Sequence, residues 1–273
     1  MGRSVVVTGA NSGIGLATAI ELARAGYQVL GTVRGEAKAD VLLREAAERG
    51  ATMTPVLCDV GDAEACEKGF VEIARQTGAV EDVTDEQARA QLEVNLVAPA
   101  RVARLVLPAM RERRDGRIVN VSSIAGRVSL PLMGWYAASK HGLEALSDAL
   151  RVEVAPFGVK VVLVEPGSFG TDIWAQGQSS LPDPTDSAYA AAYARVQAIT
   201  NRGGALPDPA WVARTIRLAL ANPLPLARYL VGVDAVGGVV GQALSPTLVQ
   251  DYVKGVGAGL RRLPFLRLPF LPR

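Results

Sequence analysis

The chain has 273 residues, of which 49% are hydrophobic, and its formal net charge is +2. This length and composition suit one α/β domain with a substantial core, and a charge so near zero gives no reason to expect a nucleic-acid partner. Cys58 and Cys66 have neither metal-ligand nor redox-motif spacing. Two such cysteines suit a reducing compartment, so we expect a cytoplasmic protein without a metal site.

Strands and helices are expected to alternate from the N-terminus. A β-branched run at 4–7 predicts a buried strand, and an amphipathic helix is expected at 14–25. Further strands are expected at 27–33, 52–57, 118–121, 160–165 and 229–233, with helices at 36–49, 63–76, 84–113, 136–155 and 208–221. The helix at 84 opens on a capping box, Thr84-Asp85-Glu86-Gln87. This alternation predicts an α/β fold: a single Rossmann-type domain with a doubly wound, mostly parallel sheet.

The turn after the first strand, Thr8–Gly15, has the glycine spacing G-x-x-x-G-x-G. Glycines at a strand-to-helix turn let the backbone approach a pyrophosphate, and the helix N-terminus offers free N–H groups and a partial positive charge. The same residues would serve a plain tight turn, but their place between a strand and a helix favours nucleotide binding. The expected cofactor contacts here are Gly9, Asn11, Ser12, Gly13, Ile14 and Gly15.

Arg34 stands at the end of the second predicted strand. An acidic residue at this point would bind the ribose hydroxyls of NAD, whereas an arginine offers a charge-assisted fork to a 2′-phosphate. A lone arginine can also be a solvated loop residue. Because 32–35 contains no acid, we predict NADP(H) in preference to NAD(H).

Tyr136 and Lys140 are four residues apart and share one face of the helix at 136–155. A phenol is a poor acid or base near neutral pH, but an adjacent ammonium favours its ionised form. Ser123, thirteen residues before Tyr136, could hold the oxygen of a carbonyl or alcohol while the tyrosine gives or takes its proton. These three residues predict the proton-transfer half of a redox reaction.

With these motifs the chain resembles the short-chain dehydrogenase/reductase family. The matching segments occur in the expected order over about two-thirds of the chain: Thr8–Gly15, Cys58-Asp59-Val60, Glu93-Val94-Asn95-Leu96, Asn120-Val121-Ser122-Ser123, Tyr136-x-x-x-Lys140, and Pro166-Gly167 followed by Thr171. Three further segments are similar to the branch that holds 17β-hydroxysteroid and retinol dehydrogenases: Thr32-Val33-Arg34, Val128-Ser129-Leu130-Pro131 and Arg228-Tyr229-Leu230-Val231-Gly232.

The resemblance implies a role for each matched residue. Tyr136 would be the acid/base, Lys140 would assist it and hold the nicotinamide ribose, Ser123 would orient the substrate oxygen, and Asn95 would help to keep a water for proton relay. Asp59 and Val60 would flank the adenine, and Pro166, Gly167 and Thr171 would line the nicotinamide. Each residue also has an ordinary explanation: a helix asparagine bonding its own backbone, strand-ending serines, a helix-capping aspartate, a Pro-Gly turn. Their occurrence together and in order favours the catalytic interpretation.

The resemblance also implies a substrate lid at about 168–206 within a domain that covers 1–260. Phe169, Ile173, Trp174 and Leu181 make this lid apolar, which suggests a small hydrophobic alcohol or carbonyl substrate. Members of the family commonly associate through two long helices, here 84–113 and 136–155, so a homodimer or homotetramer is expected.

The C-terminal tail, 261–273, is apolar and rich in proline. Its prolines forbid a regular helix, so we expect an arm packed on its own or a partner subunit, with weak peripheral membrane contact as the alternative. No segment predicts a transmembrane helix, and the first apolar run ends at Gly9, too early for a signal peptide.

One expected element is missing. The family has a central fourth strand and an Asn-Asn-Ala-Gly turn before the helix that bears Asn95, but only 34 residues separate Val60 from Asn95 and two predicted helices use most of them. Closing the gap would move the flanking strands by about 4.8 Å, and a misplacement of about 1 Å can cost about a hundredfold in rate. Either the segment was lost from the sequence, which we favour, or another segment fills the gap, or activity was lost.

Two functions therefore remain open. The first is an NADP(H)-dependent oxidoreductase that interconverts a hydrophobic primary or secondary alcohol and its aldehyde or ketone. The alternative is a catalytically impaired protein of the same fold with a binding or regulatory role.

Overall fold

The computed structural model describes residues 3–57, 78–170, 187–201 and 206–260. The predicted helix at 63–76, both cysteines, Asp59, Val60, Thr171 and the C-terminal tail lie outside the described residues, as do Ile173, Trp174 and Leu181 of the expected lid.

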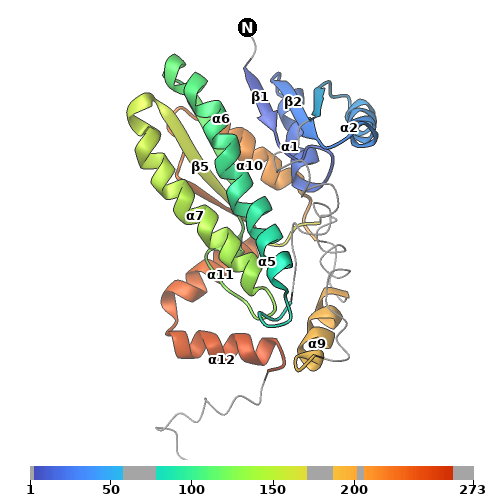
Figure 1. Ribbon diagram of the computed structural model, residues 1–273, viewed down its shortest axis with the longest axis vertical. Helices are drawn as coiled ribbons and strands as arrows, with labels where there is room; N and C mark the ends of the chain where they lie inside the picture. The colour runs from blue at the N-terminus through green and yellow to red at the C-terminus, as the bar shows by residue number, and fades with distance from the viewer. Residues whose placement is uncertain (1–2, 58–77, 171–186, 202–205, 261–273) are drawn as a thin grey trace, which may run out of the picture.

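Strands and helices alternate as predicted (Figure 1). The strands are β1 (Ser4–Val7), β2 (Gln28–Val33), β3 (Thr54–Leu57), β4 (Gly116–Val121), β5 (Val159–Pro166) and β6 (Arg228–Val231). The helices are α1 (Gly13–Arg24), α2 (Glu36–Glu48), α5 (Asp85–Leu92), α6 (Ala98–Arg113), α7 (Gly134–Val154), α9 (Ala190–Asn201), α10 (Ala210–Ala221), α11 (Val233–Leu244) and α12 (Thr247–Gly257). The sequence does not predict α9, α11 and α12: the apolar periodicity of α9 is weak, and α11 and α12 contain glycines.

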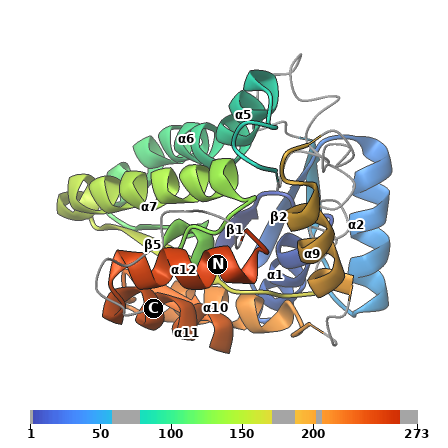
Figure 2. The ribbon, with the colours of Figure 1, turned by 90° about the horizontal axis from the view of Figure 1, so that it is seen from below.

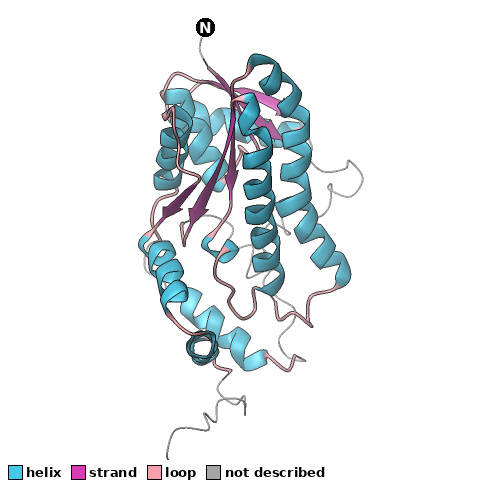
Figure 3. Cartoon of the chain, turned by 90° about the vertical axis from the view of Figure 1, so that its left-hand side faces the viewer, coloured by secondary structure: helices cyan, strands magenta, loops and turns pink. Residues whose placement is uncertain are grey.

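The strands form two parallel three-stranded sheets, ordered β1-β2-β3 and β4-β5-β6. Within the part of the chain that the structure describes, no strand joins β1 to β4, and these two strands do not pair with each other. Among the described strands, β1 and β4 therefore remain separate edges rather than closing into one sheet (Figure 3).

Helices cover both faces of the strands (Figure 2). Helices α6 and α7 pack on β4 and β5 from one side, and α10 packs on them from the other while also contacting α1. The run Val161–Val164 of β5 is buried on both faces, as expected for an inner parallel strand. In contrast, Val6 is 51% exposed on β1, which among the described strands pairs only with β2.

The predicted helix at 84–113 is one continuous helical segment with an irregular centre. Its capping box is confirmed: Gln87 N donates to Thr84 Oγ1 at 3.2 Å, and Thr84 N donates to Gln87 Oε1 at 2.9 Å. Between α5 and α6 the residues Glu93–Val97 form a π-helical turn. Such turns frequently occur at functional sites, and this one carries Asn95.

Candidate active site

A cavity of about 1620 Å³ opens at the carboxyl ends of β1, β2 and β4. It brings together every predicted site residue that the structure describes: Gly9, Asn11, Ser12, Gly13, Ile14, Gly15, Arg34, Asn95, Ser123, Tyr136, Lys140, Pro166 and Gly167. These residues come from segments far apart in the sequence. Their convergence is the placement expected for a ligand site in a parallel α/β fold, beyond the carboxyl ends of the strands.

The glycine-rich turn has the backbone geometry that a close-fitting phosphate loop needs. Gly9 has a φ of 63°, in the left-handed region. A Cβ on Gly15 would lie 2.1 Å from the Gly9 carbonyl oxygen, so no larger residue fits there. The Ser12 side chain does not cap α1, which leaves the first N–H groups of this helix available to an anion.

Two cations line the cavity beyond β2. Arg34 follows the strand, and Lys38 lies four residues later in the first turn of α2. Partial burial, and then the charge of Arg34, lower the pKa of the Lys38 ammonium. Sequence analysis missed Lys38, although its spacing from Arg34 was a usable signal.

Asn95 links the π turn to the helix that carries the tyrosine. Its side chain is 7% exposed, and its Nδ2 donates to Ser139 Oγ at 3.1 Å. Ser139 Oγ in turn donates to the backbone oxygen of Tyr136 at 2.7 Å. Ser139 was not singled out in the sequence, since its role depends on a contact between two helices.

Tyr136 and Lys140 share a face of α7, as their spacing predicts. Lys140 Nζ lies 5.9 Å from the centroid of the Tyr136 ring and donates to the Val121 carbonyl oxygen at 3.1 Å. Ser123 follows β4, and its Oγ accepts from Ala125 N at 3.1 Å. The Lys140 ammonium, the Tyr136 phenol and the Ser123 hydroxyl can therefore surround one small polar group of a ligand, such as a carbonyl or an alcohol. His141 is turned to its own helix, with Nδ1 2.9 Å from the Ala137 oxygen.

Asp234 of α11 fixes the Pro166-Gly167 turn. Its Oδ2 accepts from Ser168 N at 2.7 Å. A Cβ on Gly167 would lie 2.1 Å from Asp234 Oδ1, so the glycine lets this carboxylate approach. Sequence analysis missed Asp234, because the partner element was not predicted.

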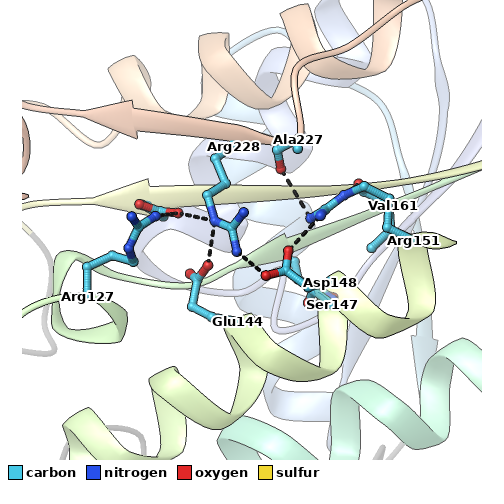
Figure 4. A network of polar contacts seen from close by, with 10 residues as sticks. Arg127, Glu144, Ser147, Asp148, Arg151, Val161, Ala227 and Arg228 are labelled. Atoms are coloured by element: carbon cyan, nitrogen blue, oxygen red, sulfur yellow. Dashed lines mark hydrogen bonds and ion pairs between the residues drawn. The ribbon is translucent and has the colours of Figure 1, made fainter.

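A buried ionic network lies behind this turn (Figure 4). Glu165 precedes Pro166 in β5 and is fully buried. Arg228 Nε lies 3.2 Å from Glu165 Oε1 and 3.0 Å from Glu144 Oε2, and Arg127 Nη1 lies 3.6 Å from Glu165 Oε1. Burial, together with the Glu144 carboxylate, raises the pKa of Glu165 to about 7 against the opposing effect of the two arginines.

Within the described ranges, no group of three or more histidine, cysteine or acidic side chains could hold a metal ion. No helix among the described residues combines the length and apolar character needed to cross a bilayer.

A parallel α/β fold with a glycine-rich turn and a Ser, Tyr and Lys group in one cavity defines a Rossmann-type oxidoreductase. Residues 3–182 match the family model described as short chain dehydrogenase, and the chain belongs to this family. The family predicted from the sequence is therefore confirmed.

Individual relatives cover most of the chain. The uncharacterized oxidoreductase YusZ of Bacillus subtilis is 34% identical over 255 residues, covering 84% of this chain and 89% of that protein. Retinol dehydrogenase 7 of Mus musculus is 31% identical, covering 91% and 86%. In the first alignment, 255 positions exceed 84% of 273 residues, so that relative has positions that this chain lacks.

Solved structures of related oxidoreductases have the same fold. A short-chain dehydrogenase from Streptomyces avermitilis is similar with a TM-score of 0.73 at 30% identity, covering 96% of this chain and 98% of that one. An actinorhodin polyketide ketoreductase solved with NADPH has a TM-score of 0.68 at 29% identity, covering 85% and 95%.

Proposed function

We propose that the protein is an NADP(H)-dependent oxidoreductase that interconverts a hydrophobic primary or secondary alcohol and its aldehyde or ketone. One observation carries the proposal: Ser123, Tyr136 and Lys140 line the same cavity as the glycine-rich turn and the Arg34–Lys38 pair. Groups that can transfer a proton and groups that can bind the phosphates of a dinucleotide therefore line one cavity.

The side chains have distinct roles in this reaction. A bound nicotinamide supplies a hydride to a carbonyl carbon or accepts one from a carbinol carbon. The Tyr136 hydroxyl gives its proton to the carbonyl oxygen in reduction and takes it from the alcohol in oxidation. Ser123 Oγ donates a hydrogen bond to the same substrate oxygen, and the Lys140 ammonium lies 5.9 Å from the centroid of the Tyr136 ring. Asn95 supports the helix backbone at Tyr136 through Ser139.

NADP(H) is preferred because Arg34 and Lys38 together offer two positive charges beyond β2. A 2′-phosphate would be held by charge-assisted hydrogen bonds that the NAD ribose cannot make. The NADPH in the related ketoreductase structure supports the same choice.

The substrate end of the cavity is apolar. Val128, Leu130 and Met133 line it on the approach to Tyr136, and Phe169 lines it after the Pro166-Gly167 turn. These side chains favour a hydrophobic substrate.

We expect a homodimer or homotetramer through α6 and α7. Val152 of α7 is 75% exposed, which suits an interface between copies.

Catalytic impairment remains the second candidate, favoured by one observation. Lys140 donates to the Val121 oxygen, on the edge of β4 that faces the missing strand. A lysine held there is less available to Tyr136 and to a nicotinamide ribose.

Purified protein titrated with NADPH, followed by a panel of hydrophobic aldehydes and ketones, separates the two candidates. We expect saturable NADPH binding and turnover that Tyr136→Phe abolishes without loss of NADPH binding. Binding without turnover would favour the impaired protein, and absence of both would refute the enzyme. Better kcat/KM with NADH than with NADPH would refute the cofactor preference alone.

A further inference from the structure

The space between β1 and β4, here called the strand slot, is part of the large cavity. Val5–Val7 of β1 and Ile118–Val121 of β4 line it from its two sides, and Val102 and Val106 of α6 lie along it. Ligand sites usually have volumes of about 300–1,000 Å³. At about 1620 Å³, this cavity has room for more than one ligand, and the strand slot is the part that the proposed nucleotide site does not explain.

Backbone groups of β1 point into the strand slot. In a parallel sheet, alternate residues of a strand direct both backbone groups to the same neighbour. The Arg3 oxygen accepts from Gln28 N at 3.0 Å, so Arg3 and the odd-numbered residues after it face β2. Ser4 and Val6 therefore direct their N–H and C=O groups to the strand slot.

The same holds for β4. Ser122 N donates to the Val164 oxygen at 2.8 Å, so the even-numbered residues face β5. Val119 and Val121 therefore direct their backbone groups to the strand slot. The Lys140 ammonium already occupies one of these groups, the Val121 carbonyl, which confirms its direction.

The backbone N–H and C=O groups on the facing edges of β1 and β4 determine which kind of ligand can bind between them. Only an extended peptide presents N–H and C=O groups with the spacing that pairs with both edges, whereas an alkyl chain would leave them unpaired. Gly9 and Ser123 lie at the carboxyl ends of β1 and β4 at the same end of the cavity, so the two edges run in the same direction.

Positively charged residues at one end of the strand slot indicate the charge that the bound peptide should carry there. Arg3, Arg113 and Arg117 line the end of the cavity where β1 and β4 begin, with Asp115 as the acidic residue among them. Arg117 Nε is buried without a hydrogen-bond partner, while Nη2 of the same side chain donates to the Asn222 oxygen at 3.3 Å and Nη1 lies 3.7 Å from Asp115 Oδ1. An acidic side chain near the N-terminus of a parallel strand would meet this positive end.

We propose that the strand slot binds an extended peptide segment supplied by another chain: five or six apolar, β-branched residues without proline, with an acidic residue near its N-terminal end. Such a strand pairs with Val119 and Val121 on one side and with Ser4 and Val6 on the other. It takes the Val121 carbonyl from Lys140 and frees this lysine for Tyr136. The last step rests on the proposed function, but the binding does not.

The probe is the peptide fluorescein-Gly-Ser-Val-Asp-Val-Val-Val-Thr-amide, titrated with the full chain while fluorescence anisotropy is measured. We expect a Kd on the order of 10 µM. Two control peptides have proline for the central valine or lysine for the aspartate, and both should bind at least about tenfold more weakly because one breaks the pairing and the other reverses the charge.

Protein variants test the edge itself. Val119→Pro removes an N–H that faces the strand slot and leaves the β4–β5 hydrogen bonds in place, so it should abolish peptide binding. Val119→Ala keeps the N–H and should bind like the parent. Val6→Pro makes the same test from β1, and circular dichroism confirms the fold of each variant.

The outcomes are distinct. Absence of binding up to about 100 µM chain, or equal binding of the proline peptide, overturns the proposal. It is also overturned if, without peptide, the Val6 and Val119 amides exchange as slowly as those of Val5 and Asn120, because the chain would then fill its own strand slot. Binding that raises NADPH-dependent turnover several-fold supports both steps. Binding with unchanged turnover overturns the release of Lys140, and binding with no turnover at all refutes the proposed enzyme while the peptide site stands.

Discussion

Among single residues, Lys38 shows how the structure adds to a motif. Arg34 alone is an ambiguous loop arginine, but Lys38 shares its edge of the cavity, and the two charges are close enough that Arg34 contributes to the lowered pKa of Lys38. Two like charges on one edge of the cavity are a favourable site for a phosphate.

Replacing Lys38 should therefore weaken NADPH selectively. For Lys38→Ala we expect the KM for NADPH to rise by about tenfold, with little change for NADH, because a charge-assisted hydrogen bond contributes about 1.5 kcal/mol. Steady-state kinetics with both cofactors measure this. Arg44→Ala, an exposed site on the same helix, is the control, and equal losses for NADPH and NADH would contradict the assignment.

Glu165 makes stability depend on pH. Its pKa is raised from 4.5 to about 7 in the folded chain, so between these pH values the folded protein holds a proton that the unfolded chain has lost. Its favourable contribution is complete below pH 4.5 and is lost as pH rises to about 7.

The variant Glu165→Gln should remove this dependence. Across that window the stability of the parent, measured relative to the variant by urea denaturation, should fall by on the order of 3 kcal/mol at most. Glu153→Gln, at an exposed site on α7, should follow the parent. A constant difference between parent and Glu165→Gln would show that Glu165 has no raised pKa.

At the scale of elements, the segment from α5 to α6 combines a predictable beginning with an unpredictable centre. The capping box could be recognised from four residues, because it depends on local hydrogen bonds. The π turn at Glu93–Val97 could not, because it depends on how the helix packs against α7.

Removing the cap tests how firmly this element is anchored. Thr84→Ala should lower the free energy of unfolding by about 1 kcal/mol, since Gln87 N loses its acceptor. Thr84→Ser keeps the acceptor and should lie within a few tenths of a kcal/mol of the parent. Chemical denaturation measures both, and equal stability of the alanine and serine variants would argue against a stabilising cap.

Features that depend on local sequence could be predicted, whereas features that depend on contacts between distant segments could not. The strand-helix alternation and the cavity residues on β1, α1, β4 and α7 follow from local patterns, which is why Ser123, Tyr136 and Lys140 were found and placed together. Ser139, Asp234 and the Glu144–Glu165–Arg228 network were not, because each acts through a partner distant in sequence. The helices α9, α11 and α12 were missed because their apolar periodicity is weak or interrupted by glycines, and β6 begins one residue and ends two residues earlier than predicted.

In the whole molecule, α1 and α10 join the two sheets. Leu220 packs against the hydrophobic clusters of both halves, and Arg217 Nε lies 2.8 Å from Glu21 Oε1 across the same contact. Because β1 and β4 share no hydrogen bonds, this contact is a principal connection between the half that contains β1–β3 and the half that contains β4–β6.

Leu220→Ala should thus destabilise the protein by about 2 kcal/mol or more and also weaken NADPH binding, since residues of both halves line the cavity. Arg217→Ala removes only a partly exposed ion pair and should cost at most about 1 kcal/mol. Thermal unfolding and NADPH titration of both variants measure the effects. Unchanged NADPH affinity in a destabilised Leu220→Ala would show that the two halves bind the cofactor independently.

Tyr193 connects α9 to the body of the molecule. Its hydroxyl accepts from Ala79 N at 2.7 Å and donates to Asp82 Oδ2 at 2.7 Å, and its buried ring packs beside Leu132. Burial raises the pKa of Tyr193 to about 12, so the donated bond persists through alkaline pH. Any movement of α9 away from Ala79 and Asp82 would break both bonds, so displacement of this helix is an activated step.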